Sequence, residues 1–174
     1  MSLEICSPCL AHKTVIWNLF QFYCYDTSAE EGCDVEETGF YSLSQDYFAQ
    51  YWTAPSWSAH LLLWDGAIAG FALIETSDAL SGALELADLF IMKRFRRHGI
   101  GRQVVRHFMS SRAVPWTVVV YDEAVGATAF WNSIFQDPSF TPSRQVPDPD
   151  DRMVTTHVLE PTIAAKPPKV KLSN

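Results

Sequence analysis

The sequence predicts a single mixed α/β domain built on one sheet. Stretches with a helical spacing of apolar residues alternate with apolar stretches typical of strands. An Asp65-Gly66 turn joins two of these strands as a hairpin, and residues 84–121 form a strand–helix–strand unit. A crossover helix lets the chain re-enter the sheet in its starting direction, so the two strands of that unit are expected to pair in parallel.

The first half of the chain is expected to hold two helices and three strands. Apolar residues three and four apart predict the helices, and Pro55 ends the second one. Residues 25–39 are rich in Asp and Glu and have almost no large apolar side chain, which predicts an exposed acidic loop. In chain order, we expect a strand over residues 3–6, a helix over 11–23, the acidic loop to 39, a helix over 43–52, and strands over 60–64 and 67–76.

The second half is expected to continue with the strand–helix–strand unit, a short helix and two antiparallel strands. Pro115 breaks the longer helix before the next strand begins. A polar turn over residues 147–151 joins the two final strands. In chain order, we expect a strand over residues 84–91, a helix over 99–112, a strand over 116–121, a helix over 126–134, and the strand pair that ends at 158.

Length and composition limit the class of protein. With 174 residues, 48% of them hydrophobic, the chain is long enough for one well-buried core and too short for two. We expect one domain over residues 1–160 and a tail over 161–174. Neither a run of 18 apolar residues nor a signal-peptide pattern is present in the sequence, which predicts a cytoplasmic protein without a membrane partner.

The cysteines are expected to be free thiols. All four fall within the first 33 residues, and the first two stand in a C-x-x-C pattern. A structural zinc site needs a second ligand pair at matched spacing, which this segment does not supply. We therefore expect no metal from this set, which consists of Cys6, Cys9, Cys24 and Cys33.

A basic segment interrupts this acidic protein. Residues 93–112 carry seven Lys and Arg and no Asp or Glu, whereas the whole chain has a net charge of −7. Gly99 and Gly101 stand between the strand that ends at 91 and the helix that follows. Glycines let backbone N–H groups turn toward an anion, and a helix N-terminus adds its dipole. The segment predicts a site for a small phosphorylated ligand, and not for nucleic acid, which needs basic charge spread over a face.

Two motifs resemble those of the GNAT family of N-acetyltransferases. Residues 96–101, Arg-Arg-His-Gly-Ile-Gly, are similar to the [QR]-x-x-G-x-[GA] signature that binds the diphosphate of acetyl-coenzyme A in that family. Residues 127–131 resemble the family's N-x-x-A-x-x-F-Y helix, except that Ala124 stands in place of Asn and Trp131 in place of Tyr. In element order the resemblance covers residues 3 to 158.

The resemblance implies a fold, a cofactor and a set of cofactor-binding residues. The implied fold is a central mixed, mostly antiparallel sheet with a splayed parallel pair and helices on both faces. The implied activity is transfer of an acetyl group from acetyl-CoA to a primary amine. The implied cofactor residues are Leu89, Phe90, Ile91, Arg96, Arg97, His98, Gly99, Ile100, Gly101, Arg102, Phe130 and Trp131.

The resemblance also implies catalytic and acceptor-binding groups. Glu85 lies eleven residues before Arg96, where the histone-acetylating branch has its general base, while Asp88 and a water are alternatives. Their spacing in a regular strand would place Glu85 and Asp88 on opposite faces. Because Trp131 has no acidic proton, the candidate general acid is Tyr121, with a water or no group at all as the alternatives. For the acceptor, an amine-bearing small molecule or peptide, the expected residues are Phe22, Tyr23, Tyr25 and Asp26.

Other classes of function remain open from the sequence. Ala124 and Trp131 also fit an acyl-CoA-binding or sensor module that has lost catalysis. A nucleic-acid-binding module would use the basic segment, but the glycine turn between strand and helix argues against it. The chain has six Trp, six Tyr and eleven Phe, more than its core needs, so a homodimer through an aromatic face is a further possibility.

Overall fold

The structure, a computed structural model, describes residues 2–110, 113–147 and 154–162. Within this part of the chain, seven strands form one sheet in the order β1-β2-β3-β4-β5-β7-β6. Neighbouring strands run antiparallel except β4 and β5, which are parallel, as the sequence predicts. The strands are β1 (Leu3–Ile5), β2 (Ser58–Trp64), β3 (Ala67–Thr76), β4 (Leu84–Ile91), β5 (Trp116–Tyr121), β6 (Arg144–Pro147) and β7 (Val154–Leu159).

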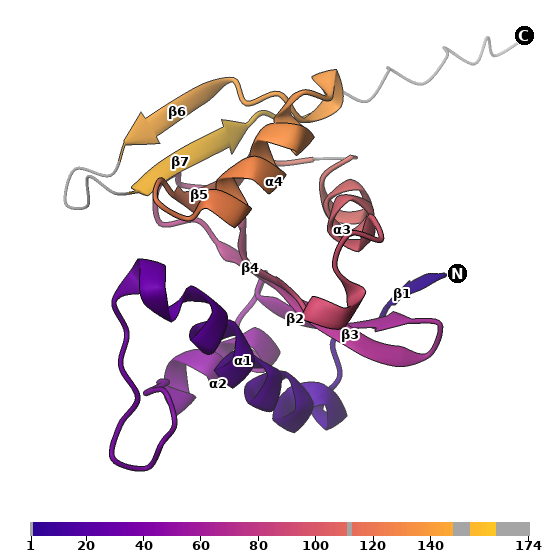
Figure 1. Ribbon diagram of the computed structural model, residues 1–174. Helices are drawn as coiled ribbons and strands as arrows, with labels where there is room; N and C mark the ends of the chain where they lie inside the picture. Colours follow the sequence, from indigo (N-terminus) through magenta and orange to yellow (C-terminus); the bar gives the residue numbers. More distant parts are fainter. Residues whose placement is uncertain (1, 111–112, 148–153, 163–174) are drawn as a thin grey trace, which may run out of the picture.

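Helices cover both faces of this sheet (Figure 1). Side chains of β3 alternate between the two faces: Phe71 and Leu73 pack under α1 and α2, while Ala72 and Ile74 pack under α3 and α4. The helices are α1 (Lys13–Glu31), α2 (Gln45–Thr53), α3 (Ile100–Met109) and α4 (Val125–Phe135), with 3₁₀ turns η1 (Leu10–His12), η2 (Lys93–Phe95) and η3 (Pro138–Phe140).

Helix α1 is longer than its sequence pattern predicts. It runs to Glu31 and stops at Gly32, which adopts a left-handed φ of 64°. The hydroxyls of Thr27 and Ser28 donate to the carbonyls of Tyr23 and Tyr25 within the helix, which satisfies these polar side chains without ending it. The prediction that the helix ends near residue 23 is therefore wrong, and the first part of the predicted acidic loop is helix.

The parallel pairing of β4 and β5 is short. Registered pairs join Leu84 to Trp116 and Glu85 to Thr117, although both strands continue for several residues beyond them. On its other side, β4 pairs with β3 along its whole length. The two parallel strands thus diverge toward their carboxyl ends, which is the splay that the family resemblance implies.

A β-bulge in β4 changes which side chains share a face. The register with β3 shifts between Leu73, which pairs with Asp88, and Ile74, which pairs with Leu86. One extra residue in β4 reverses the alternation of the side chains that follow it. The prediction that Glu85 and Asp88 lie on opposite faces is therefore wrong: both face the side of the sheet that α1 and α2 cover.

Two predicted segments fall largely outside the described residues: the turn at 147–151 and the tail at 161–174. The strands on either side of that turn, β6 and β7, pair antiparallel as predicted. Among the helices that the structure describes, none combines the length and apolar character needed to cross a bilayer.

Candidate active site

The N-terminus of α3 forms the glycine loop. Gly99 is the N-cap residue and has a left-handed φ of 74°, with no side chain hydrogen-bonded to the end of the helix. Arg97 is also left-handed, with φ 66°, so the backbone turns sharply just before the helix begins. The N–H groups of a first helical turn have no partners within the helix. This geometry leaves the end of α3 suited to an anion such as a diphosphate.

Gly101 has a different structural role from Gly99. A Cβ atom placed on Gly101 would lie 3.0 and 3.1 Å from two ring carbons of Phe130, on α4. A Cβ on Gly99 would meet nothing within 4 Å, so this position is restricted by its φ alone. The second glycine of the motif therefore lets α3 and α4 approach closely, beside the side chain of Leu89.

Several basic side chains of the loop make contacts within the protein. The Arg96 Nε donates to the carbonyl of Ile91 at 2.8 Å, and its guanidinium pairs with Asp26 of α1. Lys93 Nζ lies 3.2 Å from the same carboxylate. Arg102 donates to the backbone carbonyl of Ser133 at 2.9 Å and so joins α3 to α4. These contacts fix the shape of the loop and tie it to its neighbouring helices.

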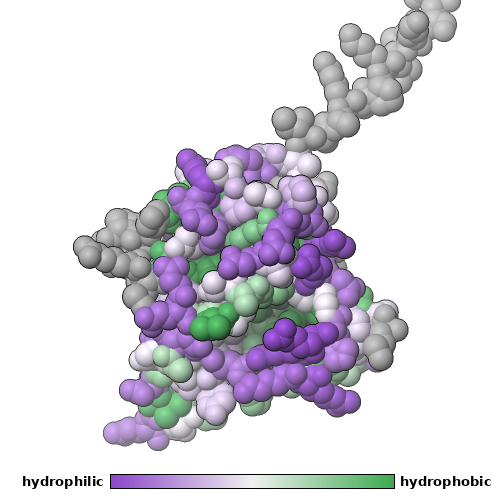
Figure 2. Space-filling view, turned by 45° about the horizontal axis from the view of Figure 1, so that its top comes forward, coloured by the Kyte–Doolittle hydropathy of each residue, from purple (hydrophilic) through white to green (hydrophobic). Residues whose placement is uncertain are grey.

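A groove crosses one face of the molecule. Figure 2 shows a hollow with a hydrophobic floor and hydrophilic rims, between the part that carries α4 and the part that carries α1. The side chains of Leu89 and Ile91 are partly buried against the α3 and α4 core, whereas that of Phe90 is buried on the opposite face. Of the three, Phe90 can contact a ligand in this groove only through its backbone.

Glu85 lies where β4 and β5 are still paired. Its Oε2 accepts hydrogen bonds from the hydroxyls of Thr117 at 2.7 Å and Ser77 at 3.2 Å. Burial raises the pKa of Glu85, while the hydrogen bond from Thr117 works in the opposite direction. The carboxylate of Glu85 is thus held by two hydroxyl groups at the closed end of the splay.

Asp88 lies beyond the last registered pair, in the diverging part of β4. Its side chain is closely surrounded by protein yet keeps some exposure, and the hydroxyl of Tyr23 donates to it. Burial is the main cause that raises the pKa of Asp88 to about 7, and the negative charge of Glu75 adds to it. A carboxyl group that titrates near neutral pH is suited to accept a proton from a substrate.

A third carboxylate, Glu75, lies next to Glu85 and Asp88. The hydroxyls of Tyr47 and Tyr51, one helical turn apart on α2, each donate to the Oε2 of Glu75 at 2.7 Å. Burial is the first cause that raises the pKa of both tyrosines, so both hydroxyls stay protonated and donate. Glu75 is also the cross-strand partner of Glu85.

The four predicted acceptor-binding residues occupy different surroundings on α1. Phe22 and Tyr25 are exposed, with 57% and 65% of their surfaces accessible. Tyr23 faces the sheet, where it contacts the rings of Phe71 and Phe90 and the carboxyl group of Asp88. Asp26 pairs with the basic loop, as described above.

The two aromatic residues considered for proton donation also differ. Tyr121 ends β5 and lies on the same face as Thr117, toward Glu85 and Asp88. Trp131 is buried against Phe135 in the core on the other face of the sheet. Trp131 therefore cannot serve as the proton donor that a Tyr at this position of the motif would provide.

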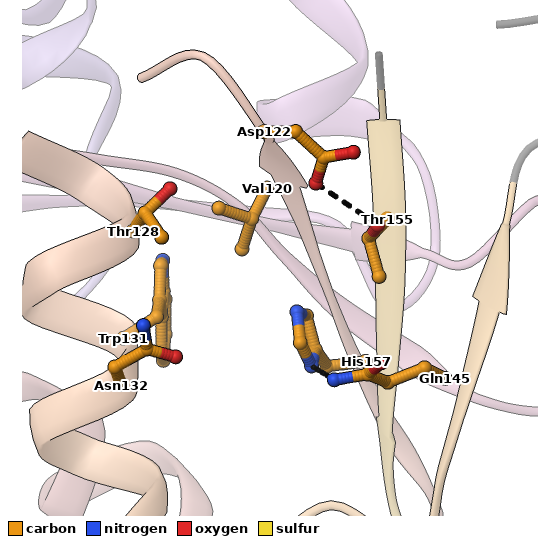
Figure 3. Close-up of a pocket in the computed structure, with 8 residues that line it drawn as sticks. All are labelled: Val120, Asp122, Thr128, Trp131, Asn132, Gln145, Thr155 and His157. Atoms are coloured by element: carbon orange, nitrogen blue, oxygen red, sulfur yellow. Dashed lines mark hydrogen bonds between the residues drawn. The ribbon is translucent and has the colours of Figure 1, made fainter. Parts of the chain in front are cut away.

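A second cavity, of about 190 Å³, lies between α4 and the strands β5, β6 and β7 (Figure 3). Its wall includes His157, which is 8% exposed and whose Nδ1 lies 3.4 Å from the amide nitrogen of Gln145. Burial lowers the pKa of His157 and favours the neutral ring. Trp131, on α4, forms the facing wall of this cavity.

In the part of the chain that the structure describes, the cysteines and the other metal-ligating residue types form no metal centre. Cys6, Cys9, Cys24 and Cys33 are free in the structure. Across the described ranges, His, Cys, Asp and Glu side chains do not assemble into groups of three or more that could hold a metal.

The hydroxyl groups around the carboxylates were not predicted from the sequence. Tyr47 and Tyr51 were placed on a helix but given no role, and Glu75 was placed only as part of a strand. A Glu near the end of an otherwise apolar strand was the available signal, because a buried charge needs partners. The spacing of the two tyrosines, four residues apart, was the second signal, since it places both on one side of a helix.

A mixed sheet with one splayed parallel pair, and a glycine loop at the N-terminus of the helix that follows, is the arrangement that the family resemblance implies. Residues 20–134 match the acetyltransferase (GNAT) family. The match covers more than half of the chain, and the chain therefore belongs to this family. A comparison with curated protein sequences finds no match.

Solved structures with this fold include several acetyltransferases. One from Thermus thermophilus has a TM-score of 0.67 and 19% identity, covering 92% of this chain and 97% of its own. The yncA protein of Salmonella typhimurium, solved with its cofactor acetyl-CoA, has a TM-score of 0.62 and 13% identity, covering 98% and 100%. The diaminobutyrate acetyltransferase EctA from Paenibacillus lautus, with its substrate and coenzyme A, has a TM-score of 0.61 and 16% identity, covering 92% and 95%.

Proposed function

We propose that this protein transfers an acetyl group from acetyl-CoA to a primary amine. The observation that carries the proposal is Asp88, a carboxyl group with a pKa of about 7 at the splay of β4 and β5. It lies on the sheet face opposite the glycine loop, so the cofactor and the acceptor would approach the splay from different sides. The EctA structure, whose printed substrate carries amines, supports an amine as the acceptor class.

Different residues of the chain would bind the cofactor and transfer protons. The first turn of α3, from Gly99 onward, would hold the diphosphate, with Arg97 beside it. The backbone of β4 from Leu89 to Ile91 lies beyond the last registered pair with β5, so an extended chain with amide groups would lie beside its free edge. When bound, acetyl-CoA supplies an activated acetyl thioester, whose C–S bond breaks as the N–C bond forms.

An amine needs a base near neutral pH. A free amine of pKa about 10.4 is almost wholly protonated at pH 7, and only its neutral form has a lone pair to attack with. The carboxylate of Asp88 takes this proton, directly or through a water, and the departing thiolate takes one from solvent or from Tyr121. Glu85 remains the alternative base, but its Oε2 already accepts two hydroxyl hydrogen bonds.

A non-catalytic acyl-CoA-binding module is the second candidate. Trp131 favours it, because that side chain is buried and has no acidic proton to give to a thiolate. The two functions differ in one measurable step: both require acetyl-CoA binding, but only the enzyme consumes the acetyl group. A cytoplasmic location and a homodimer remain predictions from the sequence.

The test combines calorimetry with product analysis. Purified protein is titrated with acetyl-CoA, then incubated with acetyl-CoA and a panel of primary amines that includes diamines, amino acids and a lysine peptide. Acetylated products are measured by mass spectrometry, because the exposed thiols of Cys9 and Cys33 would interfere with thiol reagents. Acetylated amine supports the enzyme, binding without any product favours the sensor, and no binding contradicts both.

The loop assignment has its own control. An Arg97→Glu, Gly99→Glu double variant places negative charge where the diphosphate would lie. We expect at least a 100-fold weaker affinity for acetyl-CoA, since each lost charge contact is worth about 1.5–3 kcal/mol. Unchanged affinity for acetyl-CoA in a folded variant would contradict the placement of the diphosphate site at the N-terminus of α3.

A further inference from the structure

The carboxylate of Glu75 is fixed in place from two sides. On the strand side, it is the direct neighbour of Glu85 in the antiparallel pairing of β3 and β4. On the helix side, the hydroxyls of Tyr47 and Tyr51 both donate to its Oε2 at 2.7 Å. Tyr51 is 2% exposed, so one of the two donors comes from the packed core. Two donated hydrogen bonds stabilise the charged form of a carboxylate.

The bulge in β4 places Asp88 near this clamped charge. Without it, Asp88 would point toward α3 and α4, on the other face of the sheet. With the bulge, the charge of Glu75 raises the pKa of Asp88, and the charges of both carboxylates raise the pKa of Tyr51. The titratable groups that act on Asp88 or respond to its charge are Tyr23, Cys24 and Glu31 from α1, Tyr47 and Tyr51 from α2, Glu75 from β3 and Glu85 from β4.

These groups differ in how far their negative charge is stabilised. Glu75 and Glu85 each accept two hydroxyl hydrogen bonds, whereas Asp88 receives the single hydroxyl of Tyr23. Among like charges that crowd one another, the least stabilised group takes up the proton first. Asp88, whose pKa burial raises to about 7, is therefore suited to exchange a proton near neutral pH.

We propose that Glu75 is a positioning residue for acetyl transfer: clamped by Tyr47 and Tyr51, it holds a negative charge beside Asp88 and raises the pH at which Asp88 becomes the base. This inference rests on the proposed function. Glu75 does not touch the reacting atoms, and it acts only through the charge that Asp88 experiences. Removing that charge makes Asp88 easier to ionise, so the base form persists to lower pH.

The first test is the pH dependence of the reaction. In Glu75→Gln, we expect the acid limb of kcat/KM to move down by about half to one pH unit, because one like charge is gone. Glu75→Asp, which keeps the charge, should return the limb toward its original position. Glu37→Gln makes the same change of charge in the exposed segment between α1 and α2 and should leave the profile unchanged.

The second test does not depend on activity. Carbon-13 NMR of labelled aspartate follows the titration of Asp88 directly, with Asp88→Asn used to assign its signal. The midpoint of the Asp88 titration should fall in Glu75→Gln by the same amount as the acid limb of kcat/KM. It should stay unchanged in Glu37→Gln. An unchanged midpoint in folded Glu75→Gln would overturn the inference. A shifted midpoint without any acetyl transfer would support the electrostatic coupling and contradict only the proposed function.

Discussion

Asp88 and Glu85 show how two carboxylates on one strand acquire different roles. Glu85 lies where the strands are paired, and the hydroxyls of Thr117 and Ser77 donate to it. Asp88 lies in the splay, where the backbone no longer pairs with β5 and burial raises its pKa to about 7. The environment, and not the residue type, therefore distinguishes the two carboxylates as candidate proton acceptors.

Exchanging each carboxylate for its amide separates these roles. Asp88→Asn should lower kcat/KM about 100-fold or more near pH 7, the usual contribution of a general base. Part of the loss should be recovered toward pH 10, where the amine becomes neutral without help. Glu85→Gln should lower kcat/KM by less than about tenfold, because it removes no proton acceptor from the diverging part of β4 and β5.

Steady-state kinetics over a range of pH, with acetyl-CoA affinity measured for each variant, checks this ranking. Affinity should stay within about twofold in both variants, since neither residue lies at the loop. A larger loss in Glu85→Gln than in Asp88→Asn would return the base to Glu85, the position that the family resemblance indicates.

At the scale of elements, strands were easier to predict than their faces. The bounds of β3, β4 and β5 follow directly from apolar runs between turn residues, and the structure places them as expected. The bulge in β4 has no comparable signal in the sequence, because it depends on how β3 and β4 align across the sheet. As a result, the sequence could nominate both Glu85 and Asp88 but could not show that they share a face.

The ends of helices and the hydrogen-bond partners of side chains were also difficult to predict from the sequence. Thr27 and Ser28 are typical of turns, but α1 continues through them, and their hydroxyls donate to the carbonyls of Tyr23 and Tyr25. The glycine loop was predictable because its requirement is local, in the φ of Gly99. The clamp on Glu75 was not, because it joins side chains more than 20 residues apart in the chain.

The close approach of β3 and β4 provides a prediction at this scale. A Cβ atom on Gly70 would lie 1.9 Å from the backbone oxygen of Phe90, and neither strand can move without breaking its pairing. We expect Gly70→Ala to lower the free energy of unfolding by about 3 kcal/mol or more, as a core clash that cannot relax.

Chemical denaturation monitored by circular dichroism measures this effect. Gly126→Ala is the matched control, because Gly126 lies in the first turns of α4 and a Cβ there meets nothing within 4 Å. In a helix this change should stabilise by about 0.5–1 kcal/mol. Equal behaviour of the two variants would mean that β3 and β4 are not held as tightly as the structure shows.

Across the whole molecule, the splay leaves two halves of one sheet joined by a short seam. β1 to β4 lie on one side and β5 to β7 on the other, with two registered residue pairs between them. Packing of α3 and α4 on one face adds to this junction. A ligand that lies in the groove and contacts both β4 and α4 would therefore stabilise the molecule as a unit.

Thermal unfolding with and without acetyl-CoA tests this coupling. At a concentration about 100 times the dissociation constant, binding to the folded state alone adds about 2.7 kcal/mol, which should raise Tm by about 5 to 10 °C. Gly99→Val should abolish the increase, since valine strongly disfavours the left-handed φ of 74° and the loop would change shape. Gly39→Val carries the same strain at φ 77° in the segment between α1 and α2, so its Tm should still rise with acetyl-CoA. Hydrogen exchange should slow at the N-terminus of α3 and along β4 in the wild type and in Gly39→Val. Slowing confined to α1 and α2 would place the ligand on the opposite face and contradict the assignment of the groove.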